Sequence, residues 1–238
     1  MTKVSLVIVD LQEDFLPPNG SLAIKDGRSI IPAINELLYD AKFNWSLILV
    51  TQDWHPPNHA SFASQHNVPP FTELTFTHPK GEIDPETNEV KTMKQVVWPD
   101  HCIQNTPGAT LDPSFKECVG DRRESPIIPI KKGHLPDREY YSCFQDCWGL
   151  DHTEVLSLLK TNNITDVVFV GLAYDFCVMN SAIDCAKNGF NTYVLKEYSK
   201  SVYPENVEET DKKYAENGVK VVNANEEEKL FTDIVAIS

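Results

Sequence analysis

Short apolar runs rich in β-branched residues recur along the chain and are separated by more polar segments. Such runs predict strands of a parallel sheet, because a strand covered on both faces loses the apolar and polar alternation of a half-exposed strand. The runs lie at residues 4–9, 47–50, 127–131, 167–170, 192–195 and 219–222. We therefore expect a sheet buried on both faces.

Helical segments are predicted between most of these runs. Ser29 is a candidate N-cap for a helix with apolar positions at helical spacing, and Asp151 opens a D-x-x-E start for another. A helix following Cys177 is expected to stop near Gly189, and Pro204 begins a more polar helix. The alternating order predicts an α/β fold, a three-layer sandwich with a mostly parallel central sheet.

The region 56–100 interrupts this regular order. It holds seven of the sixteen prolines and shows no periodicity. Its aromatic residues indicate a packed, functional excursion instead of disorder. With no internal repeat or linker elsewhere, residues 1–238 are expected to form a single domain.

Composition excludes several classes of partner. A formal net charge of −14 argues against nucleic acid binding, which needs clustered Lys and Arg, and no apolar run suits a membrane span. The N-terminal residues lack the pattern of a secretory signal, so we expect a cytoplasmic protein, with the nucleus as a second location. Its six cysteines are then expected to be reduced thiols: Cys102, Cys118, Cys143, Cys147, Cys177 and Cys185.

Reactive side chains stand where the predicted strands end. In parallel α/β sheets the ligand site lies beyond the carboxyl ends of the strands, so this edge is where chemistry is expected. The candidates are Asp10, Asp53, His55, Lys131, Lys132 and Cys177. Each has an ordinary alternative interpretation, as a helix cap, a solvated lysine or a buried apolar thiol.

Cys177 stands where a strand turns into a helix. Helix N-terminal amides and a neighbouring cation favour the thiolate, which predicts a lowered thiol pKa and a competent nucleophile. The same turn offers the backbone N–H groups of Ala173 and Cys177 to an oxyanion. The alternative is a buried thiol that only packs.

A metal site is indicated by Asp53 and His55, which point to the same side if the chain is extended there. His101, at the end of the excursion, is a candidate third ligand. Two histidines and a carboxylate leave open coordination positions, as in catalytic zinc and non-haem iron sites. Spacing alone leaves other ligands open, namely Cys102, His59, His66, His78, His134 and His152.

Five segments, taken in order, resemble the nicotinamidases of the isochorismatase-like hydrolases. They are Val9-Asp10-Leu11-Gln12-Glu13-Asp14-Phe15, Asp53-Trp54-His55-Pro56, Trp98-Pro99-Asp100-His101-Cys102, Lys132-Gly133 with Asp137-Arg138-Glu139-Tyr140-Tyr141-Ser142, and Gly171 to Val178. The fourth segment is similar to the fungal branch in particular. The resemblance extends from the first strand to at least residue 200.

The resemblance implies roles for individual residues. The implied catalytic triad is Asp10, Lys132 and Cys177, with Lys132 chosen over Lys131 because the family's lysine directly precedes that glycine. A cis peptide before Ala173 is implied as part of the oxyanion hole. The implied metal ligands are Asp53, His55 and His101, holding zinc or another divalent transition metal.

The resemblance also implies a substrate pocket. Phe15 and Trp98 would stack against the substrate, and Phe176 would lie at the pocket edge. The fungal branch commonly has tyrosine at the last of these positions, so a hydrogen bond at the pocket edge is in doubt. Self-association into a homo-oligomer is a further expectation from the family.

The implied activity is hydrolysis of nicotinamide to nicotinate and ammonia through a cysteine thioester, in NAD salvage. A related amidohydrolase acting on another carboxamide, carbamoyl or ureido substrate is one alternative, although it would not need the metal ligands. Hydrolysis of the isochorismate ether is another, and it would not need the thiol. A non-catalytic, metal-stabilised binding protein would leave the triad unexplained.

Overall fold

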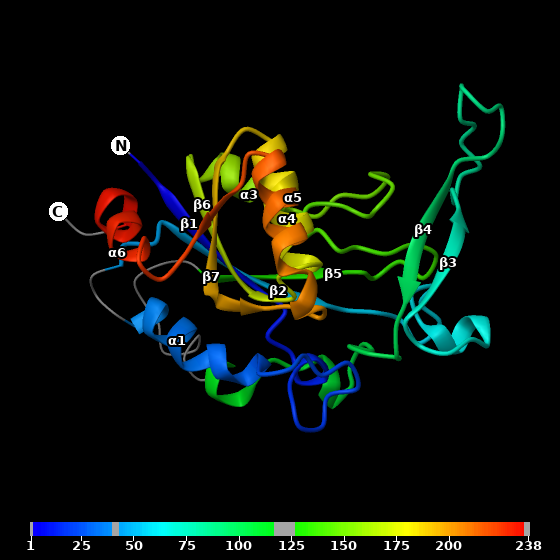
Figure 1. The fold of residues 1–238 in the computed structure, drawn as a ribbon, viewed down its shortest axis with the longest axis horizontal. Coiled ribbons are helices and arrows are strands. Elements are labelled where there is room, and N and C mark those ends of the chain that lie inside the picture. The colour runs from blue at the N-terminus through cyan, green and yellow to red at the C-terminus, as the bar shows by residue number, and fades with distance from the viewer. Residues whose placement is uncertain (1, 40–42, 117–126, 236–238) are drawn as a thin grey trace.

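The computed structural model describes residues 2–39, 43–116 and 127–235 and contains a six-stranded parallel sheet (Figure 1). Every neighbouring pair of strands in this sheet is parallel. The order is β5-β2-β1-β6-β7-β8, with bounds β1 Val4–Val9, β2 Leu47–Asp53, β5 Ile127–Lys132, β6 Asp166–Leu172, β7 Asn191–Lys200 and β8 Lys220–Val222. The predicted fold class is confirmed.

Strand β1 lies at the centre of this sheet and shows why the apolar runs form it. Leu6 and Ile8 belong to the core on one face, whereas Val7 and Val9 belong to the core on the other. All four are fully buried, so alternation of apolar and polar residues is absent. The chain order reverses beside β1, because β2 and β6 flank it on opposite sides. A ligand crevice is expected at this switch point.

Helices cover both faces of the sheet, as Figure 1 shows. Ile34 and Leu230 pack from α1 and α6 into one core, and Val155, Val178 and Tyr214 pack from α3, α4 and α5 into the other. The bounds are α1 Ile31–Tyr39, α3 Val155–Thr161, α4 Cys177–Lys187, α5 Val207–Glu216 and α6 Glu227–Leu230. No helix within the described ranges is long and apolar enough to cross a membrane.

Several predicted helix starts are wrong by one short turn. Ser29 lies inside the 3-10 turn Gly27–Ile30, and its hydroxyl donates to the carbonyl of Asp26 instead of capping α1. Helix α3 begins at Val155, four residues after the predicted start. Pro204 opens a 3-10 turn before α5. Local side-chain hydrogen bonds compete with helix capping, and that competition is decided by the surrounding chain.

The excursion at 56–100 is more regular than its sequence predicts. Strands β3 (Thr72–Thr77) and β4 (Thr92–Val97) pair antiparallel and project from the body as an arm, defined here as residues 72–97 (Figure 1). Exposed and half-buried residues alternate along β3. These strands were missed because a hairpin with one solvated face carries few apolar residues.

The five described cysteines form no disulfide with one another, and Cys118 lies outside the described residues.

Short 3-10 turns lie at Glu13–Phe15, Ala63–His66 and Pro107–Ala109, and a π turn ends the described chain at Phe231–Val235. The first of these turns brings Phe15 beneath the carboxyl edge of the sheet. The cavity described next is built there.

Candidate active site

Four of the predicted residues meet at the carboxyl edge of the sheet. Asp10 follows β1, Asp53 and Lys132 are the last residues of β2 and β5, and Cys177 is the first residue of α4. All four side chains are buried, and Asp10 and Lys132 have no exposed surface. The strand order β5-β2-β1-β6 therefore aligns these residues side by side at one edge.

Lys132 is the centre of this cluster. Its Nζ lies 3.0 Å from Asp10 Oδ2 and 3.4 Å from Cys177 Sγ. It also donates to Asp53 Oδ1 and, at 3.0 Å, to the carbonyl oxygen of Tyr140. A buried cation is tolerable only with such compensation. Lys131 points to the other side of β5, with its Nζ 3.4 Å from the ring centroid of Trp54.

The protonation of the cluster differs from the sequence-based expectation. Burial raises the pKa of the Cys177 thiol well above its usual range, and the opposing effect of Lys132 is smaller. Burial also raises the pKa of Asp10, again opposed by Lys132. The predicted low thiol pKa is thus wrong, because desolvation outweighs the nearby cation. A thiol with such a raised pKa would need a base before it could act as a nucleophile.

The turn before Cys177 contains two free backbone donors. Leu172 and Ala173 are joined by a cis peptide, as the resemblance implies. Within the part of the chain that the structure describes, the N–H groups of Ala173 and Cys177 donate to no other group. The carbonyl of Ala173 accepts from the N–H groups of Phe176 and Val178, which fixes the turn. Two unpaired N–H groups beside the thiol could bind an oxyanion.

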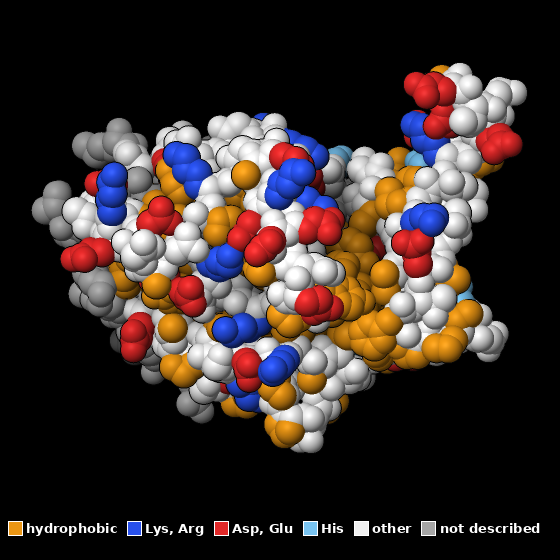
Figure 2. Space-filling view, viewed as in Figure 1, with side chains coloured by type: hydrophobic (Ala, Val, Ile, Leu, Met, Phe, Trp, Pro, Cys, Tyr) orange, Lys and Arg blue, Asp and Glu red, His pale blue; other side chains and the backbone are white. Residues whose placement is uncertain are grey.

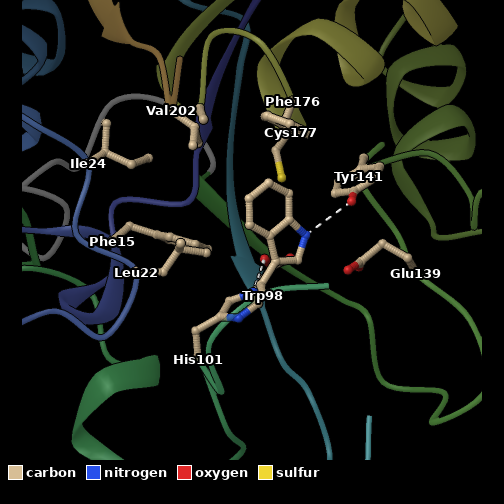
Figure 3. A pocket seen from close by; sticks show the side chains of 12 residues that line it. Phe15, Leu22, Ile24, Trp98, His101, Glu139, Tyr141, Phe176, Cys177 and Val202 are labelled. Carbon is tan, nitrogen blue, oxygen red and sulfur yellow. Dashed lines mark hydrogen bonds and ion pairs between the residues drawn. The ribbon is translucent and has the colours of Figure 1, made fainter. Parts of the chain in front are cut away.

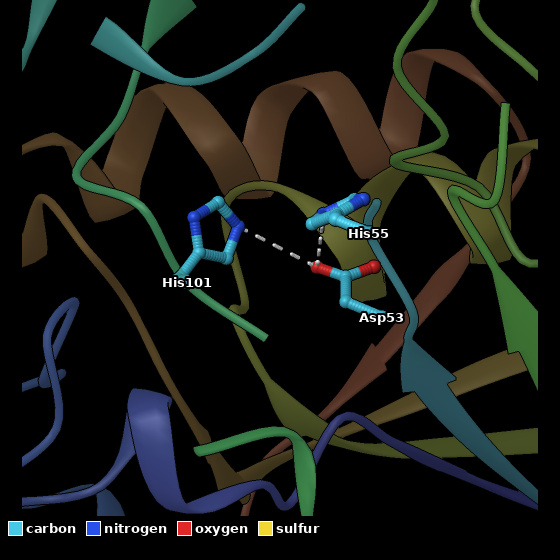
Figure 4. Close-up of side chains that lie close together, drawn as sticks. All are labelled: Asp53, His55 and His101. Atoms are coloured by element: carbon cyan, nitrogen blue, oxygen red, sulfur yellow. Dashed lines mark ion pairs between the residues drawn. The ribbon is translucent and has the colours of Figure 1, made fainter. Parts of the chain in front are cut away.

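The three predicted metal ligands lie together next to this cluster (Figure 4). Asp53, His55 and His101 are buried, and their ligand atoms lie within 4.8 Å of one another. The Nε2 atoms of His55 and His101 lie 3.5 Å and 3.9 Å from Asp53 Oδ2.

The hydrogen bonds of these histidines suit a metal. Nδ1 of His55 bonds the carbonyl of Gly133 at 2.8 Å, and Nδ1 of His101 bonds the carbonyl of Pro99 at 2.7 Å. Such bonds fix the tautomer that leaves Nε2 free to coordinate. His55 Nε2 is buried and has no hydrogen-bond partner among the described residues. The residues therefore fit a divalent ion.

Gly133 explains how the His55 ring fits beside the chain. A Cβ at this position would lie 2.4 Å from His55 Cε1, and the φ angle of +75° also disfavours other residues. The Lys132-Gly133 pair thus serves both parts of the site. The lysine enters the buried cluster with Asp10 and Cys177, and the glycine makes room for the candidate metal ligand.

The other candidate ligands fit less well. His59 stacks on His55, but its two ring nitrogens already bond Ser61 Oγ and the carbonyl of Arg138. Burial and the neighbouring His55 lower the pKa of His59 to about 3. Cys102 is fully buried, and burial raises its thiol pKa well above the usual range. His66, His78, His134 and His152 belong to no metal-type group among the residues described.

Glu139 is a site residue that the sequence did not identify. It is buried, lines the same cavity as Cys177, and forms a second group of metal-type ligands with His55 and His59. Burial alone would raise the pKa of the Glu139 carboxyl, but the opposite effect of His55 and His59 is larger. The pKa of Glu139 therefore lies below its usual range. Its place in the stretch after Lys132-Gly133 was the available signal, but no role was assigned to it.

A cavity lies beside the Cys177 thiol. In Figure 3, Phe15 lies on one side, Glu139 and Tyr141 lie on the other, and Trp98 and Cys177 lie between them. The indole N–H of Trp98 donates to the hydroxyl oxygen of Tyr141 at 3.1 Å. A flat aromatic ring would fit between such side chains.

Phe176 closes part of the cavity edge. Its ring meets Trp98 edge-on, with centroids 4.9 Å apart and planes at 90°, and it also contacts Tyr141 and Tyr203. Three aromatic rings therefore contact Phe176, which stands at the position where the fungal branch commonly has tyrosine. The predicted pocket residues Phe15, Trp98 and Phe176 all line the cavity.

Comparison with known proteins identifies the family. The profile of the isochorismatase domain matches residues 4–226. The chain belongs to the isochorismatase domain family. One curated relative, the nicotinamidase of Saccharomyces cerevisiae, is 34% identical over 222 residues, which cover 92% of this chain and 99% of the relative.

Solved structures of isochorismatase-like proteins share the fold. A crystal structure of the yeast nicotinamidase bound to the inhibitor nicotinaldehyde has a TM-score of 0.84 at 33% identity and covers 92% of this chain and 99% of that one. The structure of the pyrazinamidase of Pyrococcus horikoshii in complex with zinc has a TM-score of 0.68 at 32% identity. The match covers 93% of this chain and 99% of that one. The resemblance seen in the sequence is confirmed at the level of the family.

Proposed function

We propose that this chain is a nicotinamidase that hydrolyses nicotinamide to nicotinate and ammonia through a thioester on Cys177. The observation that supports this proposal most strongly is the contact of Cys177 Sγ with Lys132, which also forms an ion pair with Asp10. This cluster opens into an aromatic cavity beside Asp53 and His101. The family relationship and the nicotinamidase relatives support the same activity.

The chain's own residues supply each proton and each stabilising contact. Asp10 takes the proton of the thiol, and Cys177 Sγ forms a bond to the amide carbon while the carbonyl oxygen becomes an oxyanion. The N–H groups of Ala173 and Cys177 stabilise that oxyanion. Asp10 returns the proton as the C–N bond breaks, which releases ammonia and leaves the thioester.

Hydrolysis of the thioester restores the enzyme. Asp10 removes a proton from water, whose oxygen attacks the thioester carbon, and the C–S bond then breaks. Asp10 returns its proton to the sulfur, and the nicotinic acid loses its remaining proton to solvent and leaves as the carboxylate. Because the same aspartate accepts and donates protons in both halves, a carboxyl with a raised pKa suits the role.

Asp53, His55 and His101 are proposed to hold zinc, with another divalent transition metal as an alternative. When bound, the ion supplies a Lewis-acid position that can accept the pyridine nitrogen and orient the ring. Phe15 and Trp98 would then confine the ring between apolar faces. In this proposal the metal serves recognition, whereas the thiol cluster breaks the bond.

Replacing Lys132 with methionine should raise the pH at which iodoacetamide alkylates Cys177. The lysine opposes the effect of burial on the thiol pKa, so its loss leaves desolvation unopposed. The rate of alkylation would be measured against pH. Lys131→Met is the matched control, because that side chain lies on the opposite side of β5 against Trp54. A profile equal to that of the wild type would assign Lys132 another task.

Acidification should release the metal. Metal binding requires a neutral His55, and Asp53 raises the pKa of this histidine against the lowering effect of burial. A group with a raised pKa binds its proton at a higher pH than usual, so proton competition starts above about pH 6.5. The dissociation constant of the metal would be measured at several pH values. An affinity that does not weaken between pH 8 and pH 5 would contradict the proposed ligand set.

Ammonia release from nicotinamide is the decisive assay for the proposed function. Nicotinamide should be hydrolysed faster than carbamoyl or ureido compounds and faster than isochorismate. Ammonia from a ureido substrate alone would support the related amidohydrolase, and binding without turnover would support a metal-stabilised binding protein. A place in NAD salvage, a cytoplasmic location and self-association stay predictions.

A further inference from the structure

We propose that Thr51 is a positioning residue that anchors one carboxylate oxygen of Asp10, so that Oδ2 is the oxygen that exchanges the proton with Cys177. The inference rests on the proposed function and deepens it. It concerns a residue of β2 that does not line the cavity and that no sequence motif marks.

Thr51 holds Asp10 through three hydrogen bonds. The Thr51 hydroxyl donates to Asp10 Oδ1 at 2.5 Å and accepts from the Asp10 N–H at 3.2 Å. That N–H also donates to the carbonyl oxygen of Thr51 at 3.3 Å. Both residues have no exposed surface, so water cannot replace these partners. The side chain and the backbone of Asp10 are therefore held by one residue of the neighbouring strand.

The backbone of Asp10 needs such support. Its φ angle is +51°, in the left-handed region that residues with a Cβ rarely adopt. Strained conformations persist where surrounding contacts over-determine them, and they occur often at active sites. The hydrogen bonds from β2 provide these contacts at the end of β1.

The second oxygen of Asp10 has a different environment. An ammonium group has three protons, and Lys132 donates to Asp53, to the carbonyl of Tyr140 and to Cys177 Sγ. Oδ2 of Asp10 thus faces the lysine charge at 3.0 Å, and no second residue in the described ranges bonds it.

The two oxygens therefore have separate tasks. Oδ1 accepts the proton of the Thr51 hydroxyl, whereas Oδ2 faces the Lys132 ammonium at 3.0 Å and keeps acceptor capacity. Asp10, Asp53 and Cys177 each present one ligand-type atom within 4.8 Å of the others, so a carboxylate oxygen of Asp10 lies near the thiol. Lys132 Nζ lies between Oδ2 and Sγ, at 3.0 Å and 3.4 Å. Without the Thr51 hydroxyl the Asp10 carboxylate could rotate about its Cβ–Cγ bond. Oδ2 would then no longer be held toward the thiol.

Four variants isolate the hydroxyl. Thr51→Val keeps the branched shape and removes the donor, and Thr51→Ser keeps the donor. Thr51→Ala and Thr51→Ser both lack the methyl group and differ only in the hydroxyl, so this second pair tests the inference even if the valine variant does not fold. Thr192→Val is the matched control, because Thr192 is also buried in a parallel strand and its hydroxyl bonds the carbonyl of Phe190, away from the site.

The measurements separate positioning from stability. We expect Thr51→Val to lower kcat for nicotinamide by about tenfold or more, with KM and metal content unchanged. The rate of Cys177 alkylation by iodoacetamide at fixed pH should fall in parallel. Thr51→Ser should restore both rates, Thr51→Ala should not, and Thr192→Val should behave as the wild type.

Two outcomes would overturn the inference. One is a wild-type kcat and alkylation rate in Thr51→Val or in Thr51→Ala, and the other is an equal loss in the serine and alanine variants, which would assign the effect to the methyl group. The alkylation rate needs no amide substrate. If the wild-type enzyme fails to hydrolyse nicotinamide, the proposed function fails, while the alkylation rates still test the role of Thr51.

Discussion

The Cys177→Ala variant should release no measurable ammonia from nicotinamide while keeping its fold and its metal. The substitution removes the nucleophile, and without a thioester the reaction loses its only covalent route. Loss of a nucleophile lowers kcat by more than about 10³-fold in enzymes that act through a concerted catalytic unit. The proposed triad would be such a unit, because Lys132 contacts both the Cys177 sulfur and Asp10.

The measurement would combine ammonia release, circular dichroism and metal content. Cys185→Ala is the matched control, because Cys185 is buried on the same helix and belongs to the core between α4 and the sheet. Its loss costs packing but removes no reacting group. Appreciable turnover by the Cys177 variant at normal metal content would end the thioester proposal. Equal losses in both variants would indicate general damage to α4.

Removing the metal should impair the hydrolysis of nicotinamide far more than that of benzamide. The two amides share the carboxamide and the ring shape, but benzamide has no ring nitrogen to bind an ion. If the metal orients the ring, His101→Ala should lower kcat/KM for nicotinamide by on the order of a hundredfold. The rate for benzamide should change much less, so the gap between the two substrates should narrow.

Chelation of the wild-type enzyme provides an independent way to remove the ion. Both rates would be compared on samples of verified metal content, with zinc added back to test reversal. His66→Ala is a suitable control, because His66 bonds the carbonyl of Ala60 outside the candidate metal group. Should both amides lose the same factor, the metal would serve the hydrolytic water or the fold. Ring recognition would then be assigned to Phe15, Trp98 and Glu139.

The sequence by itself determined the sheet and which of the candidate side chains lie at its carboxyl edge. Uninterrupted β-branched runs such as 4–9 and 167–170 are compatible with little except buried parallel strands, and they became β1 and β6. The rule that parallel strands present ligands at their carboxyl ends then selected Asp10, Asp53 and Cys177. The strands and the placement of these residues at one edge were predicted correctly because strand burial and strand direction are encoded locally, in hydrophobicity and in the order of elements.

The tertiary structure decided what depends on the surroundings of each group. The arm strands β3 and β4 escaped prediction because hairpin pairing, and not local hydrophobicity, forms them. The direction of the Cys177 pKa shift was wrong, since desolvation exceeds the attraction of Lys132 only once the site is buried. Glu139 and Thr51 gained their places from residues distant in sequence. Burial, register and hydrogen-bond geometry arise from contacts between separate segments, so residue type and spacing alone could not specify them.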